Sequence, residues 1–283
     1  MYEEYFGLEE KPFNLTPDPY FLYLSRGHKE ALDHLYYGLI RGEGFISVYG
    51  DVGVGKTTVC RELLRMLDDG FITSLVLNPH LTEKELVRTI LDDFGVDTST
   101  GTKKDLLDRL NAFLLEQGRR GKKPVIIIDE SQNLSHILLE QVRMISNLEA
   151  DKYKLVQIIL VGQKELRDKL KSRSLRQLNQ RITVRYEIEP LSIDDARNYI
   201  NHRMGKAGSK SGVFSESACK VIFKLTRGTP RLINVVADRA LLSAYVRGGD
   251  IVEKVDVRDG VKSLGESDDL FVQKKKIFGR LFG

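Results

Sequence analysis

Residues 50–57 of the chain read Gly50-Asp51-Val52-Gly53-Val54-Gly55-Lys56-Thr57. This stretch matches the phosphate-binding pattern G-x-x-x-x-G-K-[ST] at every fixed position. The aromatic and β-branched run 45–49 before it predicts a buried strand, and the apolar spacing from 58 to 67 predicts a helix after it. A strand, a glycine-rich loop and a helix together let backbone N–H groups and a helix N-terminus hold a polyphosphate.

The residue types in this loop predict ATP and Mg²⁺ as its ligands. Lys56 would reach the β- and γ-phosphates, and the Thr57 hydroxyl would ligate Mg²⁺. The predicted nucleotide-binding residues of the loop are Gly50, Asp51, Val52, Gly53, Val54, Gly55, Lys56, Thr57 and Thr58. The alternative is a glycine-rich turn that happens to carry Lys-Thr.

The composition is that of a soluble globular protein with room for one large or two modest domains: 283 residues, 41% hydrophobic and 30% charged. A net charge of +4 permits contact with acidic lipid or nucleic acid but favours neither. Cys60 and Cys219 have no metal-ligand or disulfide spacing, which indicates buried thiols in a reducing compartment. The acidic N-terminus predicts no signal peptide, and no apolar run is long enough for a membrane span. We therefore expect a cytoplasmic protein.

A second chemical element follows the aliphatic run at 124–128. Such a run is typical of a strand buried on both faces of a parallel sheet, and it is followed by Asp129 and Glu130. Ligands of open α/β sheets bind at the carboxyl ends of the strands. The pair resembles a Walker B element, in which Asp129 would hold Mg²⁺, directly or through water, and Glu130 would polarise the attacking water. A strand that merely ends in acidic residues is the alternative.

The N-terminal region resembles one particular family. The resemblance rests on Phe6-Gly7-Leu8, Lys11-Pro12-Phe13, Pro17-Asp18-Pro19, Phe21-Leu22-Tyr23-Leu24-Ser25, His28 through Ala31, Gly44-Phe45 and Met144 through Glu149. These segments resemble the general secretion pathway protein A family, which are bacterial AAA+ ATPases, from Met1 to about Gly265. The resemblance implies an α/β P-loop NTPase fold of the AAA+ type: an αβα sandwich with a parallel sheet of about five strands and a C-terminal helical lid. Longer members add a membrane span and a peptidoglycan-binding domain, and we expect a short form here, similar to ATPases of pilus biogenesis and polysaccharide export.

The AAA+ resemblance also assigns roles to residues outside the two motifs. Gln163, after a strand expected at 155–161, would be sensor 1 and orient water against the γ-phosphate, although the superfamily commonly has a smaller residue there. Arg231, in the turn Arg227-Gly228-Thr229-Pro230-Arg231, resembles sensor 2, which reaches the γ-phosphate from the lid. The arginine-rich segment 166–185 would supply a finger to a neighbouring subunit. Arg181, at the expected end of a helix before a strand at 182–188, is favoured over Arg176, which is kept in reserve.

These assignments give a catalytic set of Lys56, Glu130, Gln163, Arg181 and Arg231, and metal ligands Thr57 and Asp129. The predicted organisation is an extended, proline-containing aromatic arm (1–24), an AAA+ nucleotide-binding domain (25–189), a helical lid (190–265) and a basic amphipathic tail (266–283). Further helices are expected at 25–40, 82–93, 104–117 and 138–149.

The tail carries an apolar stripe at helical spacing within residues 270–282, flanked by lysines and an arginine. This pattern predicts an anchor for the inner membrane surface, or for a groove on a membrane partner. A disordered solubilising tail is the alternative.

The sequence therefore predicts an ATPase that works as a homo-oligomer and serves assembly or operation of a bacterial secretion, pilus or polysaccharide-export system. Its envelope-machine partner stays unidentified, and nucleic acid is not an expected partner, since no helix-turn-helix or basic arm is visible. Two alternatives remain open: an AAA+ regulator of the DNA-transposition type, supported only by scattered arginines, and a nucleotide-gated scaffold without hydrolysis, which the Asp129-Glu130 pair disfavours. A small-molecule kinase is less favoured again, because a kinase has no place for sensor 2 and the lid.

Overall fold

The computed structural model describes the chain apart from residue 17 and the ranges 78–80, 151–152, 210–211 and 264–283. Its residues form two compact units. Unit 1 contains Met1–Gly27 together with the chain from Glu189 onward, and unit 2 contains His28–Ile188. The amphipathic tail predicted at 266–283 lies outside the described residues.

Unit 2 is built on a five-stranded parallel sheet with the strand order β2-β3-β6-β1-β7. The strands are β1 (Phe45–Gly50), β2 (Phe71–Val76), β3 (Lys123–Ile128), β6 (Gln157–Gly162) and β7 (Ile182–Ile188). Every residue of β6 is buried, and β3 is buried beyond its first residue. This is the burial that helices on both faces of a sheet produce. The parallel αβα sandwich predicted from the sequence is confirmed.

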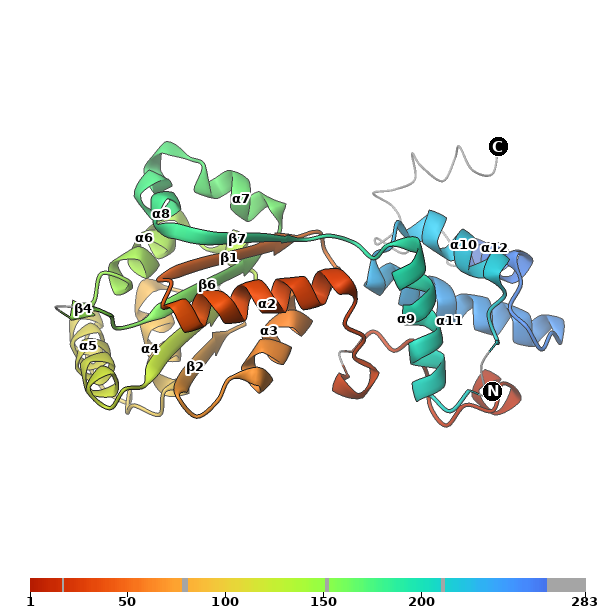
Figure 1. The fold of residues 1–283 in the computed structure, drawn as a ribbon, viewed down its shortest axis with the longest axis horizontal. Helices are drawn as coiled ribbons and strands as arrows, with labels where there is room; N and C mark the ends of the chain where they lie inside the picture. The colour runs from red at the N-terminus through yellow and green to blue at the C-terminus, as the bar shows by residue number, and fades with distance from the viewer. Residues whose placement is uncertain (17, 78–80, 151–152, 210–211, 264–283) are drawn as a thin grey trace. The chain divides into compact units, whose positions relative to one another are not determined.

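Helices cover both faces of this sheet (Figure 1). The helices of unit 2 are α2 (Arg26–Arg41, whose first two residues belong to unit 1), α3 (Lys56–Met66), α4 (Glu83–Asp93), α5 (Lys103–Arg119), α6 (His136–Ile145), α7 (Lys164–Leu170) and α8 (Arg176–Arg181). On one face, buried side chains of α4 to α8 pack on Ile126, Ile128, Ile158 and Leu160. On the other, α2 lies so close to β1 that a Cβ at Gly38 would meet Ile46 Cδ1 at 2.7 Å.

Capping residues fix where several of these helices begin. Thr82 caps α4 and forms a capping box with Glu85, as the spacing of these two residues in the sequence predicts. A second capping box, between Thr102 and Asp105, begins α5 and was not predicted. The apolar spacing of Ala31, Leu32, Leu35, Leu39 and Ile40 predicts one buried stripe on α2. Ile40 is 46% exposed, so that part of the prediction is wrong.

The helix predicted at 138–149 is wrong at both ends. The Ser135 hydroxyl accepts the Leu138 N–H and begins α6 at His136, and the helix ends at Ile145. The next residue, Ser146, turns its hydroxyl back to donate to the Arg143 carbonyl at 2.6 Å. The chain then forms two strands of two residues each, β4 (Glu149–Ala150) and β5 (Tyr153–Lys154), which pair antiparallel. Elements this short leave no periodic signal in a sequence.

Unit 1 contains four longer helices and the N-terminal arm. The helices are α9 (Ile193–Lys206), α10 (Glu216–Thr226), α11 (Pro230–Arg247) and α12 (Lys254–Ser263). The arm forms a short α-helix, α1 (Tyr2–Tyr5), and a 3-10 turn, η1 (Pro19–Phe21), so it is not extended throughout as predicted. Tyr2, Leu8, Phe13 and Phe21 of the arm are buried in the core that the helices form. The arm is thus part of the hydrophobic core of unit 1.

A buried arginine joins the arm to the helices of unit 1. Arg203 on α9 donates to the Pro12 carbonyl at 2.5 Å and to the Tyr199 hydroxyl at 2.9 Å. Its guanidinium carbon also lies 4.9 Å from the centre of the Phe21 ring. The Tyr199 hydroxyl donates in turn to Asn234 on α11 at 2.8 Å. Arg203 and Pro12 are 191 residues apart in the sequence. One cation therefore satisfies backbone and side-chain groups from distant segments of the chain.

Both cysteines are free and buried, as predicted. Burial raises the pKa of the Cys60 thiol and raises that of Cys219 to about 11, so both stay protonated near neutral pH. Among the described residues, no helix combines the length and the apolar character that crossing a membrane requires.

Candidate functional site

The phosphate loop connects β1 to α3 and depends on glycines for its shape. Gly50 ends β1, and a Cβ at this position would lie 2.5 Å from the Ile188 carbonyl oxygen. Gly55, which precedes the first residue of α3, has a φ of 100°, and a Cβ there would meet His28 Nε2 at 2.8 Å. No other residue fits either position without displacing its neighbours. The loop delivers the first N–H groups of α3 to the carboxyl edge of the sheet, where they can hold an anion.

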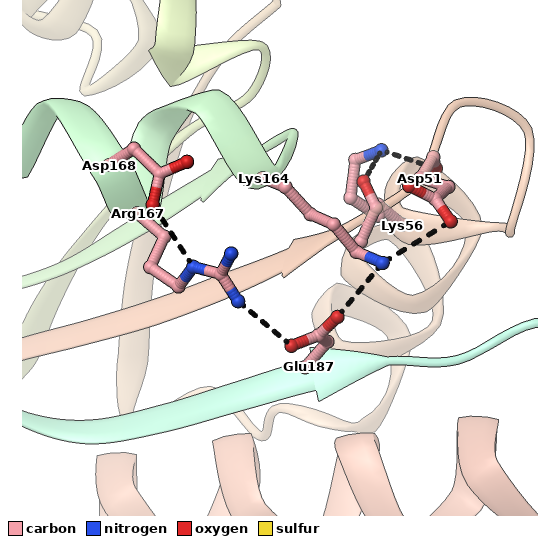
Figure 2. Close-up of polar contacts among 7 residues, drawn as sticks. Asp51, Lys56, Lys164, Arg167, Asp168 and Glu187 are labelled. Carbon is pink, nitrogen blue, oxygen red and sulfur yellow. Dashed lines mark hydrogen bonds and ion pairs between the residues drawn. The ribbon is translucent and has the colours of Figure 1, made fainter.

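Lys56 is the first residue of α3 and is 6% exposed. Its ammonium donates to the carbonyl oxygens of Gly50 and Asp51, at 3.0 Å each (Figure 2). Burial lowers the pKa of Lys56, and the charges of Glu130 and Asp129 oppose that shift. The structure thus keeps a buried ammonium against the loop that would hold the phosphates.

Asp129 lies 3% exposed directly after β3. Its Oδ2 accepts the Thr57 hydroxyl at 2.5 Å, and its Oδ1 accepts the Glu130 N–H at 2.8 Å. These two oxygen-bearing side chains come from different loops, 72 residues apart. One hydroxyl and one carboxylate fit Mg²⁺, which prefers oxygen ligands and completes its shell with waters and substrate phosphates. The described residues contain no group of three or more His, Cys, Asp or Glu side chains that could hold a metal by themselves.

Glu130 adopts a left-handed backbone conformation with a φ of 51°, which residues other than glycine rarely take. Its Oε2 accepts one hydrogen bond from Nε2 of Gln132 at 2.5 Å and another from Nε2 of Gln163 at 3.3 Å. The N–H of Gln163 donates to Gln132 Oε1 at 3.0 Å, which closes the network. The structure therefore brings Gln163, at the end of β6, to the carboxylate at the end of β3, because these two strands are neighbours.

A chain of ion pairs runs beside the phosphate loop (Figure 2). Lys164 contacts Asp51 of the loop at 3.3 Å and Glu187 of β7 at 3.1 Å. Arg167 contacts the other oxygen of Glu187 at 3.5 Å. The bond to Glu187, ahead of the bond to Asp51, raises the pKa of Lys164. The carboxylate at the second position of the loop is thereby balanced by a cation from α7.

The two candidate finger arginines lie at opposite ends of α8. Arg181 is its last residue, as predicted, and is half-buried with Nη1 donating to the Ser146 hydroxyl at 3.2 Å. Arg176 is the first residue of α8 and is exposed. Arg231, the predicted sensor 2, belongs to unit 1, where it is the exposed second residue of α11. Its role toward a nucleotide stays a prediction.

Three residues of this region were missed by sequence reasoning. The sequence motifs predict no role for Gln132 or Lys164, and His28 enters only through the family resemblance. His28 is 6% exposed and its Nε2 lies 2.8 Å from the Val54 carbonyl oxygen, beneath the phosphate loop. A buried histidine 22 positions before the loop carries no sequence signal of its own. Gln132 and Lys164, which each follow a chemical residue closely, could have been suspected.

Comparison with known proteins relates the chain to a domain family and to one curated protein. A family model described as an AAA domain matches residues 40–170. General secretion pathway protein A of Aeromonas hydrophila is 44% identical over 259 residues, which are 91% of this chain and 47% of that protein. The chain thus spans about half the length of the curated relative it matches.

Solved structures at lower identity share the fold. The ORC2 protein of Aeropyrum pernix, in ADPNP-ADP complexes, has a TM-score of 0.64 at 19% identity, covering 90% of this chain and 71% of its own. Cdc6p of Pyrobaculum aerophilum has a TM-score of 0.68 at 17% identity, and the match covers 91% of this chain and 74% of that one. The RuvB Holliday junction branch migration motor of Thermotoga maritima has a TM-score of 0.56 at 21% identity, and the match covers 87% of this chain and 73% of that one. These similarities concern the fold alone.

Proposed function

Because the chain belongs to the AAA+ family and is related to general secretion pathway protein A, we propose that it binds ATP with Mg²⁺ and hydrolyses the nucleotide as a homo-oligomer. The observation that carries the proposal is the 2.5 Å hydrogen bond between Thr57 and Asp129. It joins the hydroxyl of the phosphate loop to the carboxylate after β3, with the buried Lys56 one residue away. Phosphoryl transfer to water needs this combination of an oxygen pair for the metal and a cation for the phosphates.

Each residue of the site has a distinct task in this proposal. The loop N–H groups and Lys56 bind the β- and γ-phosphates. Glu130 accepts a hydrogen bond from the attacking water, and the amides of Gln132 and Gln163 hold its carboxylate in place at 2.5 and 3.3 Å. Bound between Thr57 and Asp129, Mg²⁺ would neutralise phosphate charge. Catalysis by these groups rests on positioning and charge stabilisation, since no covalent step on the protein is required.

The oligomer is proposed because the site needs a cation for the charge that develops on the γ-phosphate. Arg181 is the favoured donor in trans, with Arg176 in reserve, and Arg231 is proposed to act from the lid. The hydrogen bond from Arg181 to Ser146 fixes the guanidinium at the end of α8, 3.2 Å from a neutral partner. Among the described residues, the contact of this guanidinium is with a hydroxyl and not with a carboxylate, which is compatible with its binding a phosphate.

The biological role follows from the relative. Its name, general secretion pathway protein A, supports a role in a secretion pathway. We propose that ATP hydrolysis is coupled to such a bacterial envelope system, for secretion, pili or polysaccharide export. A cytoplasmic site of action fits this role, and the tail at 270–282 is proposed to contact the inner membrane surface. The chain spans 47% of the relative's length, so the relative does not identify the partner of this chain, which has to be found by experiment. Pull-down with Glu130→Gln protein, loaded with ATP, should retain it.

The test of oligomeric hydrolysis combines two inactive variants. The wild-type chain should release phosphate from ATP in Mg²⁺ and not in EDTA. Arg181→Ala should lose roughly 10³-fold in turnover while each protomer still binds ATP. Mixing it with Glu130→Gln should restore part of the activity, because an interface can combine the intact Glu130 of one protomer with the intact Arg181 of the other. A mixture as inactive as either variant, with Arg176→Ala losing turnover instead, would reject Arg181.

A further inference from the structure

A hollow of about 530 Å³ opens at the edge of the sheet opposite to the phosphate loop. The loop follows the carboxyl end of β1, whereas this hollow lies where β3 and β6 begin, at Lys123 and Gln157. Helices α2 and α5 end beside it, at Arg41 and Arg119. Its lining residues are Arg41, Gly42, Gly118, Gly121, Lys122, Lys123, Pro124, Lys154, Leu155, Val156 and Gln157.

The lining contains cationic side chains and no acidic one. The cations are Arg41, Lys122, Lys123 and Lys154. Within the described part of the chain, none of the four takes part in an ion pair, whereas Lys103 pairs with Glu83 and Lys164 pairs with Asp51. Their contacts are uncharged: Lys122 donates to the Asp69 carbonyl at 2.5 Å, and Arg41 and Lys123 lie over the rings of Tyr37 and Phe71. Among the side chains that the structure describes, these four cations therefore have no carboxylate partner.

Helix dipoles account for only part of this charge. The C-terminal ends of α2 and α5 each carry the equivalent of about −0.5 charge, together about −1, and attract nearby cations. Four lysine and arginine side chains exceed that by about three charges. Lys123 and Lys154, moreover, lie on strands β3 and β5 and not on helix ends. The excess points to an anion supplied from outside.

The shape of the hollow narrows the class of anion. Pro124, Leu155 and Val156 are buried and form an apolar floor, and Gly42, Gly118 and Gly121 place no side chain in the opening. The volume lies within the usual range for small-molecule sites. We propose that this hollow binds a phosphate-bearing group of at least two negative charges, either in a free phosphate compound or in the headgroup of an anionic lipid. This site does not depend on the proposed ATPase activity.

Two variants of equal charge test the site. Lys123→Gln/Lys154→Gln removes two cations from the hollow and spares Lys122, which bonds the Asp69 carbonyl. Lys84→Gln/Lys104→Gln removes two exposed lysines near the beginnings of α4 and α5. Lys104 and the hollow lie near opposite ends of α5, about 20 Å apart at 1.5 Å per residue. All measurements of pyrophosphate binding use Lys56→Ala protein, so that the phosphate loop does not contribute.

Two assays distinguish the sources of the phosphate group. For a free compound, calorimetric titration with inorganic pyrophosphate should show binding that the hollow variant weakens at least about tenfold and the control variant leaves unchanged. For a lipid, sedimentation with vesicles of 30% phosphatidic acid, whose phosphomonoester headgroup carries up to two negative charges, in phosphatidylcholine should show the same contrast. Vesicle binding through the tail would be equal in both variants and would therefore produce no difference between them. Equal binding by the two variants in both assays, or no binding in either, would overturn the proposal.

Discussion

Lys56 and Arg203 are two cations buried to nearly the same extent, with exposed fractions of 6% and 7%. Their partners differ. Arg203 is bonded to the Pro12 carbonyl and the Tyr199 hydroxyl and lies over two aromatic rings. Lys56 donates to carbonyls of its own loop and faces the carboxylates Glu130 and Asp129. Burial of a charge therefore does not identify a function. The chemistry of the partners does, since one set is structural and the other is arranged around a ligand.

Alanine at each of these two positions gives the largest contrast. Lys56→Ala should weaken ATP binding by about 10³-fold or more, because the polyphosphate loses its main cation. The loss of its bonds to the Gly50 and Asp51 carbonyls should be offset in part by removal of a buried charge, so unit 2 should lose less than about 2 kcal/mol of stability. Arg203→Ala should leave nucleotide affinity of unit 2 intact and should destabilise unit 1 by about 3 kcal/mol, because buried carbonyls lose a charged donor and rings lose a stacked guanidinium. Nucleotide titration measures the first effect, and hydrogen exchange resolved by peptide measures the second.

The matched control for the arginine is Arg197→Ala. Arg197 lies on the same helix in an exposed pair with Asp194 at 3.2 Å and should change stability by less than about 1 kcal/mol. If Arg203→Ala left unit 1 as protected as Arg197→Ala does, the structural interpretation of the buried arginine would be wrong.

A smaller effect is expected at the ion pairs beside the loop. Lys164→Met should weaken ATP binding about threefold to tenfold, because the Asp51 carboxylate then repels the phosphates without compensation. Adding Asp51→Asn to this variant should restore the affinity, whereas Lys171→Met, at the other end of α7, should have no effect. A double variant that binds no better than Lys164→Met would show that Lys164 does not act through Asp51.

The smallest effect concerns a second structural charge of unit 1. Asp256 is 1% exposed; burial alone would raise its pKa, but bonds from Arg247 and the Glu253 N–H outweigh burial and lower the pKa. A carboxyl group whose pKa is lower in the folded state than in the unfolded state stabilises the folded protein. This contribution is complete at pH values above the ordinary pKa near 3.8 and is lost as the pH falls through the lower pKa of the folded state. The unfolding free energies of wild type and Asp256→Asn should thus converge below about pH 4. A gap that stays constant from pH 7 to pH 3 would contradict this.

The sequence predicted the parts of the molecule that local signals determine. The glycines and Lys56-Thr57 identify the loop, and the aliphatic run before Asp129 identifies β3. The strand expected at 182–188 has those bounds as β7. By contrast, the contact of Gln163 with Glu130 spans 33 residues and depends on the adjacency of β3 and β6 in the sheet. Strand order is a tertiary property that no single motif encodes.

The arm and the basic hollow show the same limit. Prolines and aromatic residues suggested a separate arm, but the bond from Arg203 to Pro12 crosses 191 residues, and only the folded chain brings them together. The hollow gathers its cations from the end of α2, the segment after α5, the first residue of β3, and β5, which come from three stretches far apart in sequence. Each of these lysines and arginines, taken singly, looks like an ordinary solvated charge.

The most direct test of the proposed site is to separate binding from turnover in Glu130→Gln. The substitution preserves the size of the side chain and leaves Lys56, Thr57 and Asp129 in place, so the affinity for ATP with Mg²⁺ should equal that of wild type. Phosphate release should fall by about 10²-fold or more, because the amide no longer polarises the attacking water. ATP affinity from titration and phosphate release from the same preparation decide the matter. Wild-type turnover by this variant would contradict the assignment of Glu130 and place the catalytic base elsewhere.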